Sequence, residues 1–180
     1  MNKHTNKQKG FTMIEIMVAL AIMLIGVAVI APLMNDYFNS SKVSNEISAM
    51  RGSMQNLTRR YQREPITSDV DNQEMIESGM LSSNYRTSGT DVIYNIFDGI
   101  IEINGVDDNG YTWESSGIDE DVCSEFAESA RSLPVDLIQI GGEDYRYSES
   151  GNSDFTSACV SAAESSEGDT VTLTWTREEN

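Results

Sequence analysis

The sequence predicts an α+β fold, in which one long N-terminal helix packs against an antiparallel β-sheet head. Three observations lead to this prediction: an apolar block at residues 11–34, an amphipathic pattern directly after it, and later strand-like runs separated by turn residues. A chain of 180 residues accommodates one domain and an anchor. We therefore divide it into a basic leader (1–10), a long helix (11–64) and a head (65–180).

The first half of the predicted helix is apolar enough to suggest a membrane span. Residues 16–34 contain no charge, and as a helix they would be about 28 Å long, close to the thickness of a bilayer core. Lys3, Lys7 and Lys9 precede this segment, which predicts a single crossing with the N-terminus in the cytoplasm and the acidic half outside. A cleaved signal peptide and a plain anchor are the alternatives, but neither explains Glu15 at the start of the apolar run.

The stretch KGFTMIEIMVALAIMLIG at residues 9–26 resembles the N-terminus of type IV pilin precursors and related pseudopilins. In that family a basic leader ends in Gly, the next residue becomes the new N-terminus, and Glu lies four positions later. These features correspond to Gly10, Phe11 and Glu15. The resemblance implies that a prepilin peptidase cleaves between Gly10 and Phe11 and that the amine of Phe11 is then methylated.

We interpret Glu15 as an assembly residue. The amine of Phe11 in a neighbouring subunit would neutralise the carboxylate when helices stack side by side, and such a buried pair would penalise wrong axial registers. The alternative is a carboxylate that simply reaches the cytoplasmic membrane interface.

The second half of the predicted helix, about residues 35–63, carries one apolar stripe. Its members recur at alternating steps of four and three: Val43, Ile47, Met50, Met54, Leu57 and Tyr61. Polar residues, Glu46 among them, lie between these positions. The stripe predicts packing on a sheet rather than a two-helix coiled coil, for which it is short. We also expect a kink at Pro32 and a helix end before Pro65.

The head contains a series of shorter predicted elements. Asp71 is expected to cap a short helix, and DVIYNIFDGIIEIN predicts a hairpin with a tight turn at Asp98-Gly99. Residues 119–133 read as a helix with acids in its first turn. YTWES, VDLIQI and TVTLTWT are predicted strands, the last alternating between apolar residues and threonines.

Two cysteines, Cys123 and Cys159, lie in the head. They form no CxxC pair and have no histidine nearby, which opposes a zinc site. If this half lies outside the cytoplasm, a disulfide is expected, and two unpaired buried thiols are the alternative.

The head more narrowly resembles type IVb pilins, in particular the PilS-like pilins of conjugative thin pili. The likeness rests on NIFDGIIEI, on YTWESSGIDEDVCSEF and on a late Cys159 ahead of a closing strand. It implies that Cys123 and Cys159 form the disulfide of the pilin head. The 10-residue leader and Phe11 depart from this pattern and are closer to type IVa pilins.

Composition opposes several other functions. A net charge of −17 is unsuited to nucleic-acid binding. The one histidine, His4, lies in the leader, and no catalytic or phosphate-binding motif occurs, so we predict no enzyme activity, no cofactor and no metal site.

The resemblance instead implies a subunit that waits in the inner membrane and polymerises into an extracellular filament. The implied partners are further copies of the chain, a prepilin peptidase, the pilus assembly platform and minor pilins. The alternatives are a pseudopilin of a type II secretion system and, last, a membrane-anchored periplasmic binding module.

Overall fold

The structure, a computed structural model, describes residues 11–61, 66–67, 69–106, 110–166 and 170–177. The chain forms two compact units, residues 1–38 and residues 39–180. Helix α1, Met13–Arg60, contributes to both. Gly10 and Pro65, where we expected cleavage and the helix end, lie outside the described residues.

The long helix is confirmed, with slightly narrower bounds than predicted. Its backbone stays helical through Gly26 and Pro32. The side chain of Pro32 lies outside the described residues, and the kink expected there stays a prediction.

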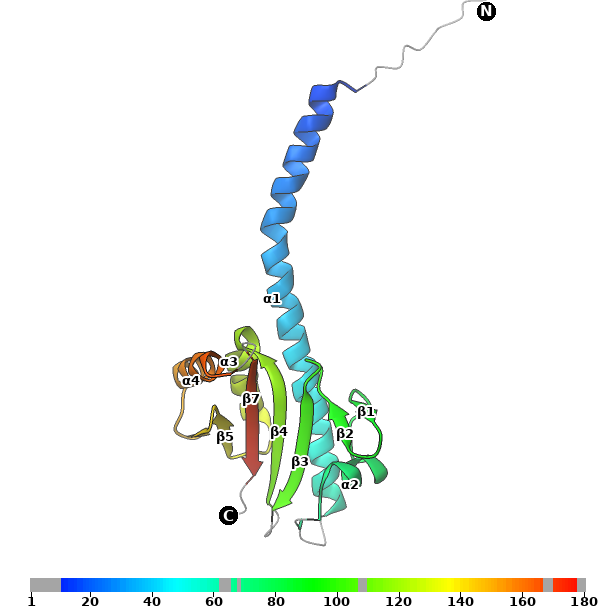
Figure 1. The fold of residues 1–180 in the computed structure, drawn as a ribbon, viewed down its shortest axis with the longest axis vertical. Helices are drawn as coiled ribbons and strands as arrows, with labels where there is room; N and C mark the ends of the chain where they lie inside the picture. The colour runs from blue at the N-terminus through cyan, green and yellow to red at the C-terminus, as the bar shows by residue number, and fades with distance from the viewer. Residues whose placement is uncertain (1–10, 62–65, 68, 107–109, 167–169, 178–180) are drawn as a thin grey trace, which may run out of the picture. The chain divides into compact units, whose positions relative to one another are not determined.

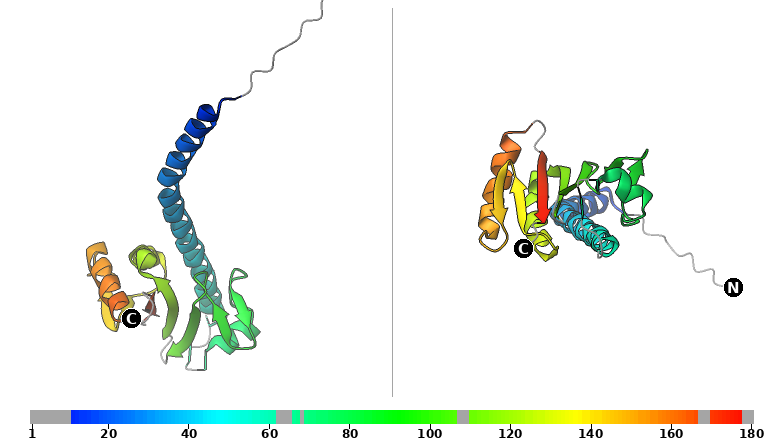
Figure 2. Two further views of the ribbon diagram at one scale, coloured as in Figure 1. Left: turned by 45° about the horizontal axis from the view of Figure 1, so that its top comes forward. Right: turned by 90° about the horizontal axis from the view of Figure 1, so that it is seen from below.

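A seven-stranded antiparallel sheet forms the centre of the larger unit, in the order β1-β2-β3-β4-β7-β5-β6 (Figures 1 and 2). Its strands are Arg86–Ser88 (β1), Val92–Tyr94 (β2), Ile100–Val106 (β3), Gly110–Asp119 (β4), Leu137–Ile140 (β5), Glu143–Arg146 (β6) and Thr170–Arg177 (β7). The α+β prediction is therefore confirmed. The short strands β1 and β6 were not predicted.

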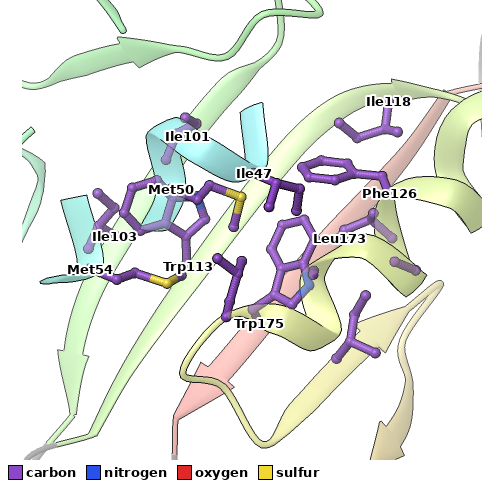
Figure 3. Close-up of a cluster of buried hydrophobic side chains, with 14 of the residues drawn as sticks. Ile47, Met50, Met54, Ile101, Ile103, Trp113, Ile118, Phe126, Leu173 and Trp175 are labelled. Carbon is purple, nitrogen blue, oxygen red and sulfur yellow. The ribbon is translucent and has the colours of Figure 1, made fainter. Parts of the chain in front are cut away.

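The predicted stripe of α1 supplies one layer of the core. Val43, Ile47, Met50, Met54 and Leu57 are all buried. Figure 3 shows the side chains of Met50 and Met54 beside Trp113 and the isoleucines of β3. Burying a side chain of this size contributes about 1.5–3 kcal/mol, so the stripe fixes α1 to the sheet, as predicted.

The remaining helices complete this unit. They are α2 (Asn72–Glu77), α3 (Glu120–Ser129), a 3₁₀ turn (Ala130–Ser132) and α4 (Asn152–Glu164). Asp71 caps α2 as expected, because its Oδ1 accepts a hydrogen bond from the Glu74 amide at 2.9 Å. Helix α4 was not predicted. The disulfide between Cys123 and Cys159 joins it to α3.

The β2–β3 hairpin is confirmed, but its turn is longer than the predicted two residues. Strand β2 ends at Tyr94, and residues 95–99 form the turn. The buried side chain of Asn95 organises it: Oδ1 accepts from the amides of Phe97 (2.9 Å) and Gly99 (2.8 Å). A Cβ at Gly99 would lie 1.8 Å from the Ser116 carbonyl oxygen, so only glycine fits there.

Candidate assembly surface

The N-terminal unit exposes an unusually large apolar surface. Phe11 is 83% exposed, and the large apolar side chains that follow it along α1 are exposed as well. They are Met13, Ile14, Ile16, Met17, Val18, Leu20, Ile22, Met23, Leu24, Ile25, Val27, Ile30, Met34, Tyr37 and Phe38. A contiguous apolar surface of this extent marks a site that binds a partner or a membrane.

Within the part of the chain that the structure describes, no helix combines the length and the apolar character needed to cross a membrane. The span predicted at residues 16–34 is thus not confirmed.

Glu15 lies at the N-terminal end of this surface and caps the helix. Its Oε2 accepts hydrogen bonds from the Thr12 amide and the Thr12 hydroxyl, each at 3.0 Å. In return the Glu15 amide donates to Thr12 Oγ1 at 3.3 Å. This reciprocal arrangement is a capping box, and it satisfies backbone donors that a helix start leaves without partners.

The capping box leaves the charge of Glu15 uncompensated. No described cation forms an ion pair with its carboxylate, which is exposed. Glu15 is therefore both a structural cap and an anion at the free end of an apolar surface. Sequence reasoning identified the second property and missed the first, although the T-x-x-E spacing ahead of an apolar run signals it.

A second acid of α1, Glu46, fastens the helix to the head. It is only 1% exposed. Its Oε1 accepts from the Tyr85 hydroxyl at 2.8 Å, and its Oε2 accepts from the Ile96 amide at 3.0 Å. The sequence placed Glu46 only among the polar residues between the stripe positions, and its burial was not predicted. Its two oxygens join α1 to the segment before β1 and to the β2–β3 turn.

Burial raises the pKa of the Glu46 carboxyl, while the hydrogen bonds from Ile96 and Tyr85 lower it to a smaller extent. The folded state therefore holds this proton more tightly than the unfolded chain. The contribution of Glu46 to the free energy of unfolding is therefore largest at low pH. It falls as the pH rises from the pKa of the unfolded chain, about 4.3, through the higher pKa of the folded state.

We expect Glu46→Gln to remove this pH dependence. Glutamine has only one acceptor oxygen for the two donors. If this oxygen accepts from the Ile96 amide, the Tyr85 hydroxyl must change from donor to acceptor, and the loss of the carboxylate's hydrogen bonds should cost about 1–3 kcal/mol of stability. Denaturant unfolding across pH 4 to 8 measures both effects, with Glu102→Gln on the exposed side of β3 as the matched control. A constant difference between wild type and Glu46→Gln at every pH would contradict the assignment.

The opposite side of the head is held together by an aromatic and polar cluster. Trp175 Nε1 donates to the Tyr147 hydroxyl at 3.0 Å, and this hydroxyl donates to the Ala127 carbonyl at 2.9 Å. Arg131 stacks over the rings of Tyr147 and Phe155, at 5.3 and 5.6 Å from their centroids. These contacts connect β7, α3, the 3₁₀ turn and the segment that contains Tyr147 with α4.

The disulfide lies in the same region. Cys123 and Cys159 are 0% and 2% exposed, with their Cα atoms 5.9 Å apart. The expected pairing is confirmed, and the alternative of two unpaired thiols was wrong. Among the described residues, no three His, Cys, Asp or Glu side chains are placed to hold a metal ion.

Comparison with known proteins finds one similarity at the level of sequence and one at the level of fold. The family model described as the prokaryotic N-terminal methylation motif matches residues 5–31. Among solved structures, the chain is similar to a type IVb pilin from Salmonella typhi, with a TM-score of 0.59 and 16% identity. The match covers 76% of this chain and 99% of that pilin.

No curated protein sequence matches the chain. The structural likeness, at its low identity, establishes the fold, and the matched motif includes Gly10, Phe11 and Glu15. The chain thus combines a prokaryotic N-terminal methylation motif with a type IV pilin fold.

Proposed function

We propose that this chain is a structural subunit of a type IV pilus of the type IVb kind, polymerised through the apolar part of α1. The observation that carries the proposal is the contrast between the two units. The head buries its own core, whereas the large apolar side chains described between Phe11 and Phe38 are exposed along a helix that ends in an uncompensated acid. Bundling such helices side by side would remove that surface from solvent or lipid.

Processing is the first step of the proposed function. A prepilin peptidase would cleave between Gly10 and Phe11, and the new amine of Phe11 would be methylated. The methylation-motif match spans this bond and supports the step. Cleavage would also remove Lys3, Lys7 and Lys9 and create a cation four residues before Glu15.

Assembly would then use that cation. In the proposed contact, the Phe11 amine of one copy lies against Glu15 of its neighbour and neutralises it within the helix bundle. A mispaired charge in such surroundings is strongly unfavourable, so the pair would select one axial stagger.

The same features support a proposed cellular location for the chain before and after assembly. The apolar surface would hold the precursor in the inner membrane, and the lysines of the leader favour a cytoplasmic N-terminus. A head stapled by a disulfide fits an oxidising compartment and, after assembly, the cell surface. The assembly platform and minor pilins would be the further partners.

Mass spectrometry of the full chain, produced in a host with a prepilin peptidase and a pilus assembly system, tests the proposal. We expect a mature chain that begins at Phe11, is one methyl group heavier than the unmodified peptide and is found in long surface filaments. Short periplasmic assemblies would instead indicate a type II secretion pseudopilin. An N-terminus at any residue other than Phe11 would overturn the proposed processing.

A further inference from the structure

A basic hollow lies beside the C-terminal part of α1. It has a volume of about 520 Å³ and is lined by Arg51, Arg59 and Arg177, together with Thr58 and Pro134. Three arginines around one hollow are notable in a chain of 29 acidic and 12 basic residues. We call this hollow the arginine groove.

The positive charge of the arginine groove is only partly satisfied. Arg51 donates to the Ser132 hydroxyl at 2.5 Å, and Arg177 donates to the Thr58 hydroxyl at 3.2 Å. Arg59 is exposed and makes no hydrogen bond or ion pair within the described residues. Asp136 is an acid near Arg177, because its amide donates to the carbonyl of Thr176 at 3.0 Å. Arg51 and Arg59 form no ion pair with any residue that the structure describes, so their charges are available to a partner.

Unpaired acids gather where β4 passes into α3. Asp119 ends the strand, and Glu120 and Asp121 begin the helix. All three side chains are exposed, and no described cation pairs with them. We call these residues the acidic turn.

The sheet places the arginine groove and the acidic turn at opposite ends of the head. In the β4–β7 ladder, Tyr111 pairs with Arg177 at one end and Asp119 with Thr170 at the other. A strand of 10 residues spans about 30 Å. In Figure 1, β7 accordingly ends at one side of the head and α3 begins at the other.

The length of α1 gives a similar separation between the arginine groove and the acidic turn. Ser40 of α1 donates to Glu125 of α3 at 3.1 Å, which aligns this level of α1 with the acidic helix. Arg59 lies 19 residues further along α1, or about 28 Å at the helical rise. Within one copy the two patches therefore cannot meet.

We propose that the arginine groove binds the acidic turn of a second copy of this chain. The contact joins different surfaces on the two copies, so it is heterologous. Such a contact builds a helical filament when the rotation between copies does not close a ring, and this is the case that the proposed function requires. It rests on the proposed function and adds to it a head-to-head contact separate from the apolar bundle. Opposite charges at exposed surfaces also make the contact sensitive to salt.

A charge exchange in the full chain tests the contact. Arg59→Glu and Asp121→Arg should each lower the yield of filaments about tenfold, and the two together should restore most of it. Arg60→Glu, at an exposed position of α1 that does not line the groove, makes the same change in net charge as Arg59→Glu and should leave the yield unaltered. Equal yields from all variants, or no recovery in the double variant, would overturn the contact.

Cross-linking reads the contact directly. In an Arg59→Lys variant, a carbodiimide should couple position 59 to Glu120 or Asp121, and the separation above makes any such product intermolecular. Arg86→Lys is the control for the chemistry, because Arg86 lies against Asp98 within the same copy.

The two proposals fail in different ways. Filaments without the position-59 cross-link would overturn the contact and leave the pilus function in place. A wild-type chain that forms no filaments would overturn the pilus function. In that case the same cross-linking would be carried out on copies held in the membrane. The position-59 cross-link would support the contact, and its absence would overturn it.

Discussion

Glu15→Gln is expected to reduce filament growth strongly while leaving both the helix start and the processing site intact. Glutamine still accepts the hydrogen bonds from Thr12, as it does in other capping boxes, so the local structure at residues 12–15 should persist. What it lacks is the negative charge that would neutralise the Phe11 amine of a neighbour. We therefore expect processed subunits to accumulate, and the filament fraction to fall by about tenfold or more.

Thr12→Ala is the matched control for Glu15→Gln. It removes the hydroxyl of the capping box but keeps the carboxylate, so filament yield should stay near that of the wild type. Electron microscopy and immunoblotting of sheared filaments measure the yield, and mass spectrometry confirms cleavage. Filaments lost with Thr12→Ala and kept with Glu15→Gln would show that Glu15 acts as a cap alone.

Removing the disulfide is the second change with a large expected effect. The bond joins residues 36 positions apart, and closing such a loop in the unfolded chain corresponds to about 4 kcal/mol in the chain-entropy model. The Cys123→Ala/Cys159→Ala double variant should lose roughly this free energy of unfolding. Denaturant titration of the processed chain in detergent, followed by tryptophan fluorescence, gives the difference.

A reductant supplies the control. Wild-type protein unfolded in its presence should refold to the stability of the double variant, whereas the variant itself should not respond. Because both sulfurs are buried, reductant alone should act slowly on the folded head. A stability loss below about 1 kcal/mol would contradict the assigned role, since even short loops gain more in this model.

Periodic patterns made much of this fold predictable. The α1 stripe repeats with the helical period, and its predicted members from Val43 to Leu57 are buried, while Tyr61 at its end is only partly buried. The run TVTLTWT alternates with the period of a strand, and Val171, Leu173 and Trp175 are buried in β7. In both elements one face packs on the core, so the apolar residues recur with the period of the backbone, about 3.6 residues in a helix and two in a strand.

The misses occur where a polar side chain has a long-range partner. Glu46 lies three residues after Val43 and four before Met50, a spacing that places it on the flank of the stripe. Its partners Tyr85 and Ile96 are distant in the sequence, so no local pattern reveals the bonds. Asn95 is similar, because its contacts to Ser115 and Ser116 come from the folded sheet.

Helix α4 was missed for a different reason. Its residues are mostly small and polar, which resembles a linker. The available signals were Asp154, whose carboxylate accepts from the Gly151 amide at 2.7 Å, and the helical spacing of Phe155, Ala158 and Ala162. Alanines bury little apolar area, so their helical spacing is only weak evidence for a helix in the sequence.

The place of β7 in the sheet has a consequence for the order in which the head is made. This strand is the last described element of the chain, yet it lies between β4 and β5 near the middle of the sheet. Until β7 is synthesised, one edge of β4 has no partner strand. Trp113 of β4 then also lacks Trp175, the residue of β7 that lies opposite it. A nascent chain therefore cannot complete the head stepwise from its N-terminus. Folding must wait for the C-terminal residues, and the unfinished sheet needs protection from edge-to-edge aggregation until then.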